Sequence, residues 1–422
     1  MHSSSTIAPG KKASKTHTRQ FARRAQLLAG TTTFADMATP LVLPWYGYDV
    51  SHSLALMAIM FLAEALLPVM AGLGLSAPLG RMAPAAVIKW GQGGRAVLFT
   101  ALLGVAELYN HDLVCTALVI GSGINGLCSV LAESAIQSAI PGEGQALTAM
   151  AERIQRAITV MKMIGAPVGA ILIASVGPDV TVGVLAASAL ASGLAGAVWL
   201  PTQTDAPAVV TPTTGQWTEG FHKLWRMPVI RSLALQAMTG NFGWSLVTSG
   251  FLFYLLHTLH VTGHTVSGVY LIIAIGSVAG TFVVTPLLGR FRRGRLYPVF
   301  LLGGVLGLLM LQWPSPWEAA LGEGIVGLCD TAWVVLSTGV RLERIPSSDR
   351  PLVLTTSRLL SNSLVPVGGI IVALWGIHWG FGTLFGLAAG VKALEVVIAK
   401  TTAVGRVDED ACCAVAAMRV AG

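Results

Sequence analysis

Hydrophobic residues recur along the chain in long stretches that short polar turns separate. Most of these stretches are close to the roughly 20 residues that a helix needs to cross a bilayer. They lie at residues 25–48, 53–76, 84–106, 113–138, 155–176, 179–200, 229–257, 266–288, 296–313, 319–340, 352–376 and 380–400. The pattern therefore predicts an all-α membrane protein with about twelve transmembrane helices.

A polar stretch divides these segments into two groups of six. Residues 201–214 are rich in Pro and Thr, and the short segment 216–225 is amphipathic, which is typical of a helix on the inner membrane surface. The predicted organisation is a cytoplasmic tail at 1–24, a six-helix domain at 25–200, a cytoplasmic linker at 201–228, a second six-helix domain at 229–400 and a cytoplasmic tail at 401–422.

Basic residues are distributed asymmetrically between the two predicted sides of the membrane. With a cytoplasmic start, none of the six outer connections contains Lys or Arg, so all 27 basic residues fall in inner segments or within helices. This is the positive-inside bias, and it predicts that both termini are cytoplasmic in a plasma or bacterial inner membrane. The apolar stretch after residue 24 carries no small-residue cleavage site, which favours a retained tail over a signal peptide.

The composition argues against several functional classes. Hydrophobic residues make up 54% of the chain and charged residues 11%, with a mean hydropathy of +0.70, whereas a soluble domain has about 25% charged residues. We interpret the net charge of +7 as orientation beside anionic lipids, not as nucleic-acid binding. No GxxxxGK[ST] nucleotide motif occurs, and the five cysteines lack metal-ligand spacing. We therefore expect no enzyme, no cofactor and no bound metal.

The two groups of six segments share short sequence matches, in the same order and at offsets near 200 residues. Such a repeat is the trace of a duplicated membrane domain, and it predicts a 6+6 arrangement. The matches pair Pro78–Arg81 with Pro286–Arg290, Ile140–Glu143 with Ile345–Ser348, and Pro167–Gly169 with Pro366–Gly368.

Three stretches resemble the major facilitator superfamily, and within it the drug and siderophore exporter branch that includes macrolide efflux pumps and the enterobactin exporter. They are Phe34-Ala35-Asp36 followed by Leu43-Pro44-Trp45 in the first segment, the run Glu219–Pro228 before the seventh, and Gly165-Ala166-Pro167-Val168-Gly169, which is similar to the fifth-helix antiporter motif. The resemblance covers nearly the whole chain. It implies the major facilitator fold, a monomer, and alternating access between two halves.

The resemblance also implies residues with gating or conformational roles. These candidates are Arg81, Gly165, Pro167, Gly169 and Arg290. The family signature after the second helix normally contains Asp-Arg, whereas this chain keeps Arg81 and lacks the acid. A charge latch of the usual kind is therefore not expected here.

Carboxylates inside apolar segments are the candidates for proton coupling. A charge at the bilayer centre is expensive, so such residues are rare and usually functional. Asp36, Glu64 and Asp330 lie near the middles of the first, second and tenth segments, and a structural hydrogen bond is the alternative role for each. Glu133 and Glu323 lie nearer segment ends, and we interpret them as solvated by snorkelling.

Amide and indole side chains in segments four, seven and ten are the candidates for the substrate cavity. They are Asn125, Asn241, Trp244 and Trp333. The asparagines could hydrogen-bond a substrate, with an interhelical hydrogen bond as the alternative, and the tryptophans could stack on a flat or lipophilic ligand. Lys162 in the fifth segment lies deep enough to pair with a midplane acid.

These features lead to one main functional hypothesis and one alternative. The main hypothesis is a secondary active transporter that exports an amphipathic small molecule, such as an antibiotic, drug or siderophore, in exchange for protons. The alternative is an importer or facilitator of a small metabolite with the same fold.

Overall fold

The computed structural model describes residues 10–74, 83–107, 110–138, 144–200, 214–288, 290–346 and 349–402. Helices dominate this part of the chain, and it contains no strand. The elements are α1 (Gly10–Ser51), α2 (Leu54–Gly74), α4 (Pro84–Ala106), α5 (His111–Ser138), α6 (Gly144–Val176), α7 (Pro178–Trp199), α8 (Thr214–Arg226), α9 (Pro228–Phe253), the π-helix η1 (Tyr254–Thr258), α10 (Gly263–Leu288), α11 (Arg293–Met310), α12 (Pro316–Arg344), α13 (Arg350–Asn362) and α14 (Val365–Thr401). The predicted all-α membrane fold is confirmed.

The membrane-spanning character follows from helix length and apolarity. Seven stretches of the described residues are long and apolar enough to cross a membrane, among them Leu352–Trp375 and His378–Thr401. The second of these lies within α14 and the first runs from α13 into α14, yet they are separate spans because Gly380 has φ 76° and ψ 160°. A glycine adopts that left-handed conformation without steric strain, so the chain can reverse there.

Helix α1 begins earlier than the sequence predicted. The first apolar segment was expected to start at residue 25, whereas α1 starts at Gly10. The polar stretch between these points contains Lys, Arg, Ala and Gln, which are good helix formers, so the helix continues beyond the apolar part. Apolar composition marks the membrane-spanning part of a helix, but it does not mark the helix end.

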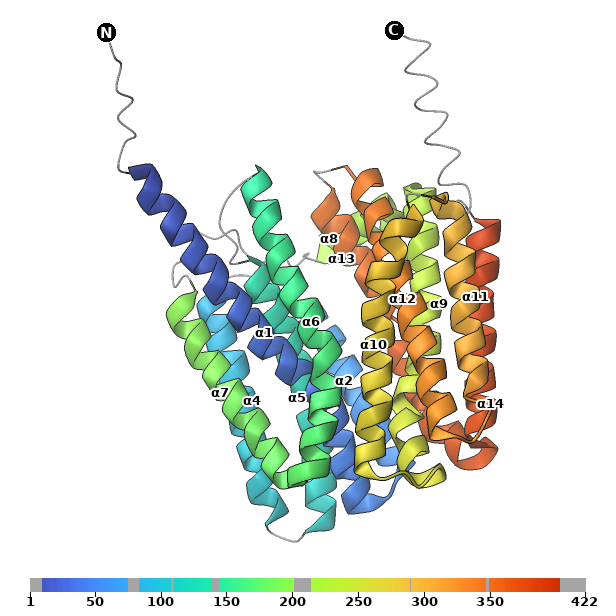
Figure 1. Cartoon of the computed structure of the whole chain (residues 1–422). Helices are drawn as coiled ribbons and strands as arrows, with labels where there is room; N and C mark the ends of the chain where they lie inside the picture. Colours follow the sequence, from blue (N-terminus) through green and yellow to red (C-terminus); the bar gives the residue numbers. More distant parts are fainter. Residues whose placement is uncertain are drawn as a thin grey trace, which may run out of the picture.

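The helices form two bundles, α1–α7 and α9–α14, which Figure 1 shows side by side. In the first bundle α1 packs against α6, α5 and α7, and α4 packs along α7. In the second, α12 packs against α10 and α11, while α14 packs against α9 and α11. We call these bundles the N-half and the C-half.

The two halves converge at the end away from the chain termini and diverge toward the end where the termini leave (Figure 1). At the converged end, the Tyr48 ring lies 5.7 Å from the Phe253 ring across the interface. Gly263 of α10 is so close to α6 that an added Cβ would lie 2.9 Å from the Ala174 Cβ. The structure is therefore closed at the end opposite the termini.

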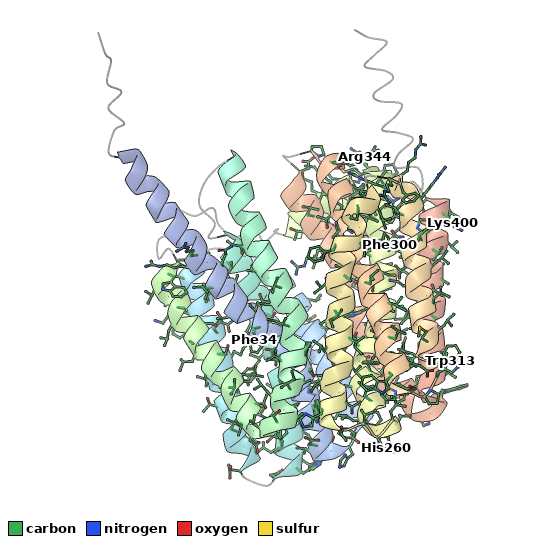
Figure 2. The ribbon with its side chains drawn as sticks, viewed as in Figure 1. Phe34, His260, Phe300, Trp313, Arg344 and Lys400 are labelled. Atoms are coloured by element: carbon green, nitrogen blue, oxygen red, sulfur yellow. The ribbon has the colours of Figure 1, made fainter. Side chains whose placement is uncertain are left out.

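The basic side chains of Arg344 and Lys400 lie at the end from which the termini leave (Figure 2). His260 and Trp313 lie near the converged end. This is the distribution that the positive-inside bias would produce with a cytoplasmic start.

Helix α8 connects the halves and packs on the C-half. Leu224 is fully buried in a cluster with Ile230, Ile345 and Val353. Lys223 Nζ lies 2.7 Å from Glu219 and 2.9 Å from Asp349 at the start of α13. These two carboxylates raise the pKa of Lys223, and the contact fastens α8 to the C-half.

Candidate functional site

A buried ion pair joins α1 to α4 in the N-half. The Asp36 Oδ1 lies 2.5 Å from the Arg95 Nη1, and the two side chains are only 7% and 0% exposed. Arg95 Nη2 also donates to the backbone carbonyl of Asn125 at 3.0 Å, and its Nη1 donates to Gln92 Oε1 at 3.3 Å. A buried pair needs such extra hydrogen bonds to offset the desolvation of its charges.

Asn125 extends this network to α2. Its side-chain amide donates to Glu64 Oε1 at 3.0 Å. The helices are close at this point, because a Cβ added to Gly126 would collide with the backbone carbonyl of Glu64. In the part of the chain that the structure describes, this network contains the carboxylates of Asp36 and Glu64 and one cation, Arg95, and we call it the N-half network.

Helix α6 crosses α1 beside Asp36 through its small residues. A Cβ at Gly165 would lie 2.5 Å from the Met37 Cβ, and one at Gly169 would lie 3.1 Å from the Ala38 Cβ. Pro167 is buried between them inside α6. The predicted motif therefore lies against the turn of α1 that carries Asp36.

A second buried ion pair joins α12 to α14 in the C-half. The Lys392 Nζ lies 2.5 Å from Asp330 Oδ1 and 3.4 Å from Glu395 Oε1. Lys392 and Glu395 are 6% and 2% exposed. The pair is anchored to α9, because Gln236 Nε2 donates to the backbone carbonyl of Glu395 at 3.4 Å.

A pocket lies beside this second pair, and we call it the C-half pocket. Its lining residues are Gly240, Gly243, Trp244, Val247, Leu308, Glu323, Val326, Asp330 and Lys392. Trp244 is 48% exposed, and its ring lies 6.1 Å from the Phe61 ring of α2. The pocket is thus on the side of the C-half that faces the N-half.

Glu323 is one of the pocket residues, so its interpretation as a solvated residue at a helix end is wrong. Among the described residues its buried Oε1 has no hydrogen-bond partner. Close helix contacts on both sides enclose it: a Cβ at Gly322 would lie 2.5 Å from the Gly307 carbonyl oxygen, and Gly324 is in contact with α10 at Gly276. Sequence position near a helix start did not show that neighbouring helices cover this turn.

Two other predicted cavity residues make contacts between helices. Asn241 Nδ2 donates to Asn362 Oδ1 at 2.8 Å and to the Ser361 carbonyl at 3.1 Å. Trp333 Nε1 donates to Gln236 Oε1 at 3.1 Å, and Trp333 does not line the C-half pocket. For Asn241 the alternative role of an interhelical hydrogen bond matches the geometry, and Trp333 makes a contact of the same kind.

For the remaining predicted residues the structure gives few or no side-chain contacts. Arg81 and the side chains of Glu133 and Lys162 lie outside the described residues. Arg290 is exposed just after α10. Within the described part of the chain, no group of three or more His, Cys, Asp or Glu side chains is arranged to hold a metal ion.

Sequence reasoning assigned no role to Arg95 or to the Lys392–Glu395 pair. The signal that could have found them is the same one that identified Asp36, namely a charge inside an apolar segment. Arg95 lies near the middle of segment 84–106, and Lys392 and Glu395 lie within segment 380–400.

Comparison with known proteins agrees with this architecture. Residues 26–341 match the family model described as Major Facilitator Superfamily, and none of the curated protein sequences matches the chain. The structure is similar to a bacterial homologue of the iron transporter ferroportin in an inward-facing state, with TM-score 0.69 and 13% identity over 90% of this chain and 98% of that chain.

Two further solved structures show the same likeness. A variant of the nucleoside transporter NupG has TM-score 0.61 and 13% identity over 90% of this chain and 98% of that chain. A bacterial metal transporter has TM-score 0.64 and 13% identity over 90% of this chain and 97% of that chain. At such identity the likeness concerns the fold alone, whereas the family match covers most of the sequence. The chain belongs to the major facilitator superfamily, a family of membrane transporters.

Proposed function

We propose that this protein is a secondary active exporter that moves an amphipathic small molecule out of the cell in exchange for protons. Membership of the major facilitator superfamily supports the transport of a small molecule by two halves that alternate in access. The proton coupling, the outward direction and the cargo class of antibiotic, drug or siderophore are the parts that we propose.

The observation that carries proton coupling is the N-half network. Among the described side chains it holds two carboxylates, on α1 and α2, against one guanidinium, on α4. A buried carboxylate without a partner cation is stable only when it holds a proton. The network can therefore take up a proton without leaving a net buried charge.

Helix contacts connect Asp36 to the interface between the halves, so its protonation can change the packing there. A neutral Asp36 no longer attracts Arg95, so the contact between α1 and α4 weakens. Helix α1 packs against α6 through Gly165 and Gly169, and α6 in turn packs against α10 of the C-half. Breaking a buried pair is worth about 3–5 kcal/mol, which approaches the roughly 5.5 kcal/mol that turns a 1:99 equilibrium into 99:1.

The outward direction is supported by the side on which the halves diverge. With a cytoplasmic start, the separated ends of the bundles face the cytoplasm (Figure 1). A cytoplasmic cargo would enter from that side. Beside the C-half pocket, whose enclosed volume is about 10 Å³, such a cargo would meet the half-exposed Trp244 ring, apolar side chains and charged groups.

An importer or facilitator of a small metabolite is the alternative, because a nucleoside transporter shares the fold. Flux in acid-loaded inside-out vesicles separates the two. Macrolides, other lipophilic antibiotics and catecholate siderophores are added outside, and the luminal pH is followed. Export in exchange for protons raises the luminal pH with one class of compound, whereas proton-coupled uptake does not respond to cargo added on that side.

The matched variants are Asp36→Asn and, as control, Asp112→Asn, because Asp112 has an exposed side chain at the start of α5. We expect the pH response in the wild type and the control but not in Asp36→Asn. An unchanged response in Asp36→Asn, at equal expression, would exclude the N-half network as the coupling site.

A further inference from the structure

The connections at the converged end of the two halves contain histidines and carboxylates but no permanent cation. They join α1 to α2, α4 to α5, α6 to α7, α9 to α10, α11 to α12 and the two spans of α14, and none of them contains Lys or Arg. Histidine is the side chain whose charge normally changes between about pH 5 and 8, so all positive charge at this end depends on pH. Six of the nine histidines of the chain lie in or beside these connections: His52, His111, His257, His260, His264 and His378.

The two kinds of group are divided unequally between the halves. The N-half end holds four carboxylates and two of the histidines, whereas the C-half end holds one carboxylate and four histidines. All of these side chains are exposed, so their charge follows the pH of the solution on that side. With neutral histidines both ends are negative, whereas with protonated histidines the N-half end stays negative and the C-half end becomes positive. The carboxylates are Asp49, Glu107, Asp112 and Asp179 on the N-half and Glu318 on the C-half.

The titrating groups meet at the contact between the halves. The Tyr48 ring of the N-half lies 4.9 Å from the His52 ring and 6.4 Å from the His257 ring of the C-half. The His257 ring in turn lies 6.3 Å from the His260 ring. His257 belongs to the π-helix η1, and such helices are rare and often occur at functional sites. A charge on His257 therefore appears directly beside the N-half.

The N-half carboxylates are held near the end of α1, the helix that contacts α9 of the C-half. The Tyr46 hydroxyl donates to Asp179 Oδ1 at 2.7 Å, which holds the start of α7 beside α1. A ring nitrogen of His111 lies 3.1 Å from the Val50 carbonyl oxygen, which brings the start of α5, with Asp112, to the same place. The negative charge of the N-half is thus collected where the C-half histidines approach it.

We propose that the converged end is a pH-operated gate, which protonation of the C-half histidines holds closed. Neutral histidines leave two negative ends that repel each other, whereas protonated C-half histidines attract the carboxylates of the N-half. Protonation of His52 and His111 opposes this attraction, but the N-half has more carboxylates than histidines. A state that binds protons more tightly is favoured as the pH falls, so acid on this side shifts the equilibrium toward closure.

This gate goes beyond the proposed function, because it needs only the two access states and neither the cargo nor the coupling site. With a cytoplasmic start the converged end is the outer one, so an acidic exterior favours the state that is open toward the cytoplasm. In an exporter that exchanges cargo for protons, the gate would return the carrier inward after it has released cargo into an acidic exterior.

The test measures the distance between the halves at the converged end as the pH changes. Spin labels are attached to Asn110→Cys on the N-half and Thr262→Cys on the C-half, two exposed and uncharged positions. The full-length protein is used in neutral lipid nanodiscs, with its native cysteines replaced by serine. We expect the ratio of closed to open protein to be about tenfold higher at about pH 5 than at about pH 8, as a few exposed charge pairs would produce. Salt at about 1 M should remove most of this difference, because it shortens the Debye length to about 3 Å.

Two sets of histidine variants make the test specific. Replacing the C-half histidines should abolish the pH response, and thermal unfolding shows whether this variant is folded. The matched control, His52→Gln with His111→Gln, should keep or enlarge the response, because no N-half histidine then opposes closure. Opening in acid by the wild type, an equal loss of the response in both variants, or a wild-type response in the C-half variant would overturn the proposal. The C-half substitutions are His257→Gln, His260→Gln, His264→Gln and His378→Gln.

Failure of the gate can be distinguished from failure of the proposed function. Asp36→Asn should keep the pH-dependent change in distance while it loses cargo-driven proton movement in vesicles. If Asp36→Asn abolishes the distance change with all histidines present, the N-half network senses the pH and the gate proposal fails. If the distance change requires the C-half histidines but no cargo moves protons, the gate is supported and the proposed coupling fails.

Discussion

Asp36 of α1 and Arg95 of α4 form an ion pair of 2.5 Å in which neither side chain is more than 7% exposed. Both side chains are buried among neighbouring helices, where each charge alone would be strongly unfavourable. Arg95 also binds the backbone of α5 at Asn125, whose amide reaches Glu64 on α2. One arginine therefore links α1, α4 and α5 directly and α2 through Asn125, so a change in its charge balance would affect the packing of these four helices.

Removing one partner of this pair should destabilise the protein, whereas removing both should not. Asp36→Leu leaves a buried guanidinium without its countercharge, and we expect a loss of about 3–5 kcal/mol. The double variant Asp36→Leu with Arg95→Met replaces the pair by apolar side chains and should recover most of that loss. Thermal unfolding in detergent measures both.

The double variant should regain stability without regaining transport. We expect the double variant to be folded but to lack cargo-driven proton movement, because no titratable group remains at position 36. Proton-coupled transport in the stable double variant would show that the pair is a structural element only.

The close contact between α6 and α1 predicts strong sensitivity at Gly165. A Cβ there would lie 2.5 Å from the Met37 Cβ, so Gly165→Ala forces the helices apart at the turn that carries Asp36. We expect a destabilisation of about 1–3 kcal/mol and reduced transport. Gly104→Ala in α4 is the control, because an added Cβ there meets nothing within 4 Å; it should be neutral or slightly stabilising. Equal effects of the two substitutions on thermal unfolding would contradict the packing argument.

The fold could be predicted from the sequence because the residues of a helix that lie inside a membrane must be mostly apolar, so apolar stretches show which segments span it. Segment 84–106 coincides with α4, and the break between segments 352–376 and 380–400 coincides with the reversal at Gly380. The start of α1 was missed because helix propensity, and not apolarity, extends that helix into polar sequence.

The site was predicted less completely because partners across the bundle leave no local pattern. Asp36 and Asp330 are visible as isolated charges in apolar segments, but the pairing with Arg95 and Lys392 joins residues that are far apart in sequence. Glu323 was assigned to solvent because it is near a helix start, and only the packing of α10 and α11 around its turn encloses it. The sequence thus shows the type of a residue and its position along an apolar segment, but it does not show whether a neighbouring helix buries its side chain.

The aromatic contact that closes the converged end should control the balance between the two access states. The Tyr48 ring of the N-half lies 5.7 Å from Phe253 and 6.4 Å from His257 of the C-half. Each such ring contact is worth about 0.5–1.5 kcal/mol, so Tyr48→Ala should shift the equilibrium toward the opposite state by roughly tenfold.

Spin labels at Asp112 and Glu318, exposed positions on the N-half and C-half, report this shift as a longer inter-label distance. Tyr48→Phe keeps the ring and should leave the distance distribution unchanged. The contact has no gating role if Tyr48→Ala gives the same distribution as Tyr48→Phe.

Lys223 should determine how firmly α8 is held on the C-half. Its raised pKa reflects the hydrogen bonds to Glu219 and Asp349. The pKa of this lysine is higher in the folded state than its ordinary value of about 10.4. Its contacts therefore stabilise the folded state fully at a pH below that ordinary value, and this stabilisation is lost only as the pH rises through the raised pKa. Amide protection factors in α8 should therefore be insensitive to Lys223 titration between about pH 7 and 9, and Lys223→Gln should lower them at every pH in that range. Unchanged protection in Lys223→Gln would mean that Leu224 and its apolar neighbours suffice to hold the helix.

We expect Trp244 to act in transport and Trp333 to stabilise the fold. Trp244 lines the C-half pocket and is 48% exposed, so Trp244→Ala removes an aromatic surface open to the cargo and should reduce cargo-driven proton movement several-fold with little loss of stability. Trp333 donates to Gln236 at 3.1 Å away from the pocket. Trp333→Phe leaves the Gln236 oxygen without its donor, which costs about 1–3 kcal/mol for a buried group, so it should lower the unfolding temperature and leave the cargo-driven proton movement per folded protein unchanged. If cargo-driven proton movement is lost instead in Trp333→Phe at unchanged stability, the cargo contacts the helix face that carries Trp333 and not the exposed ring of Trp244.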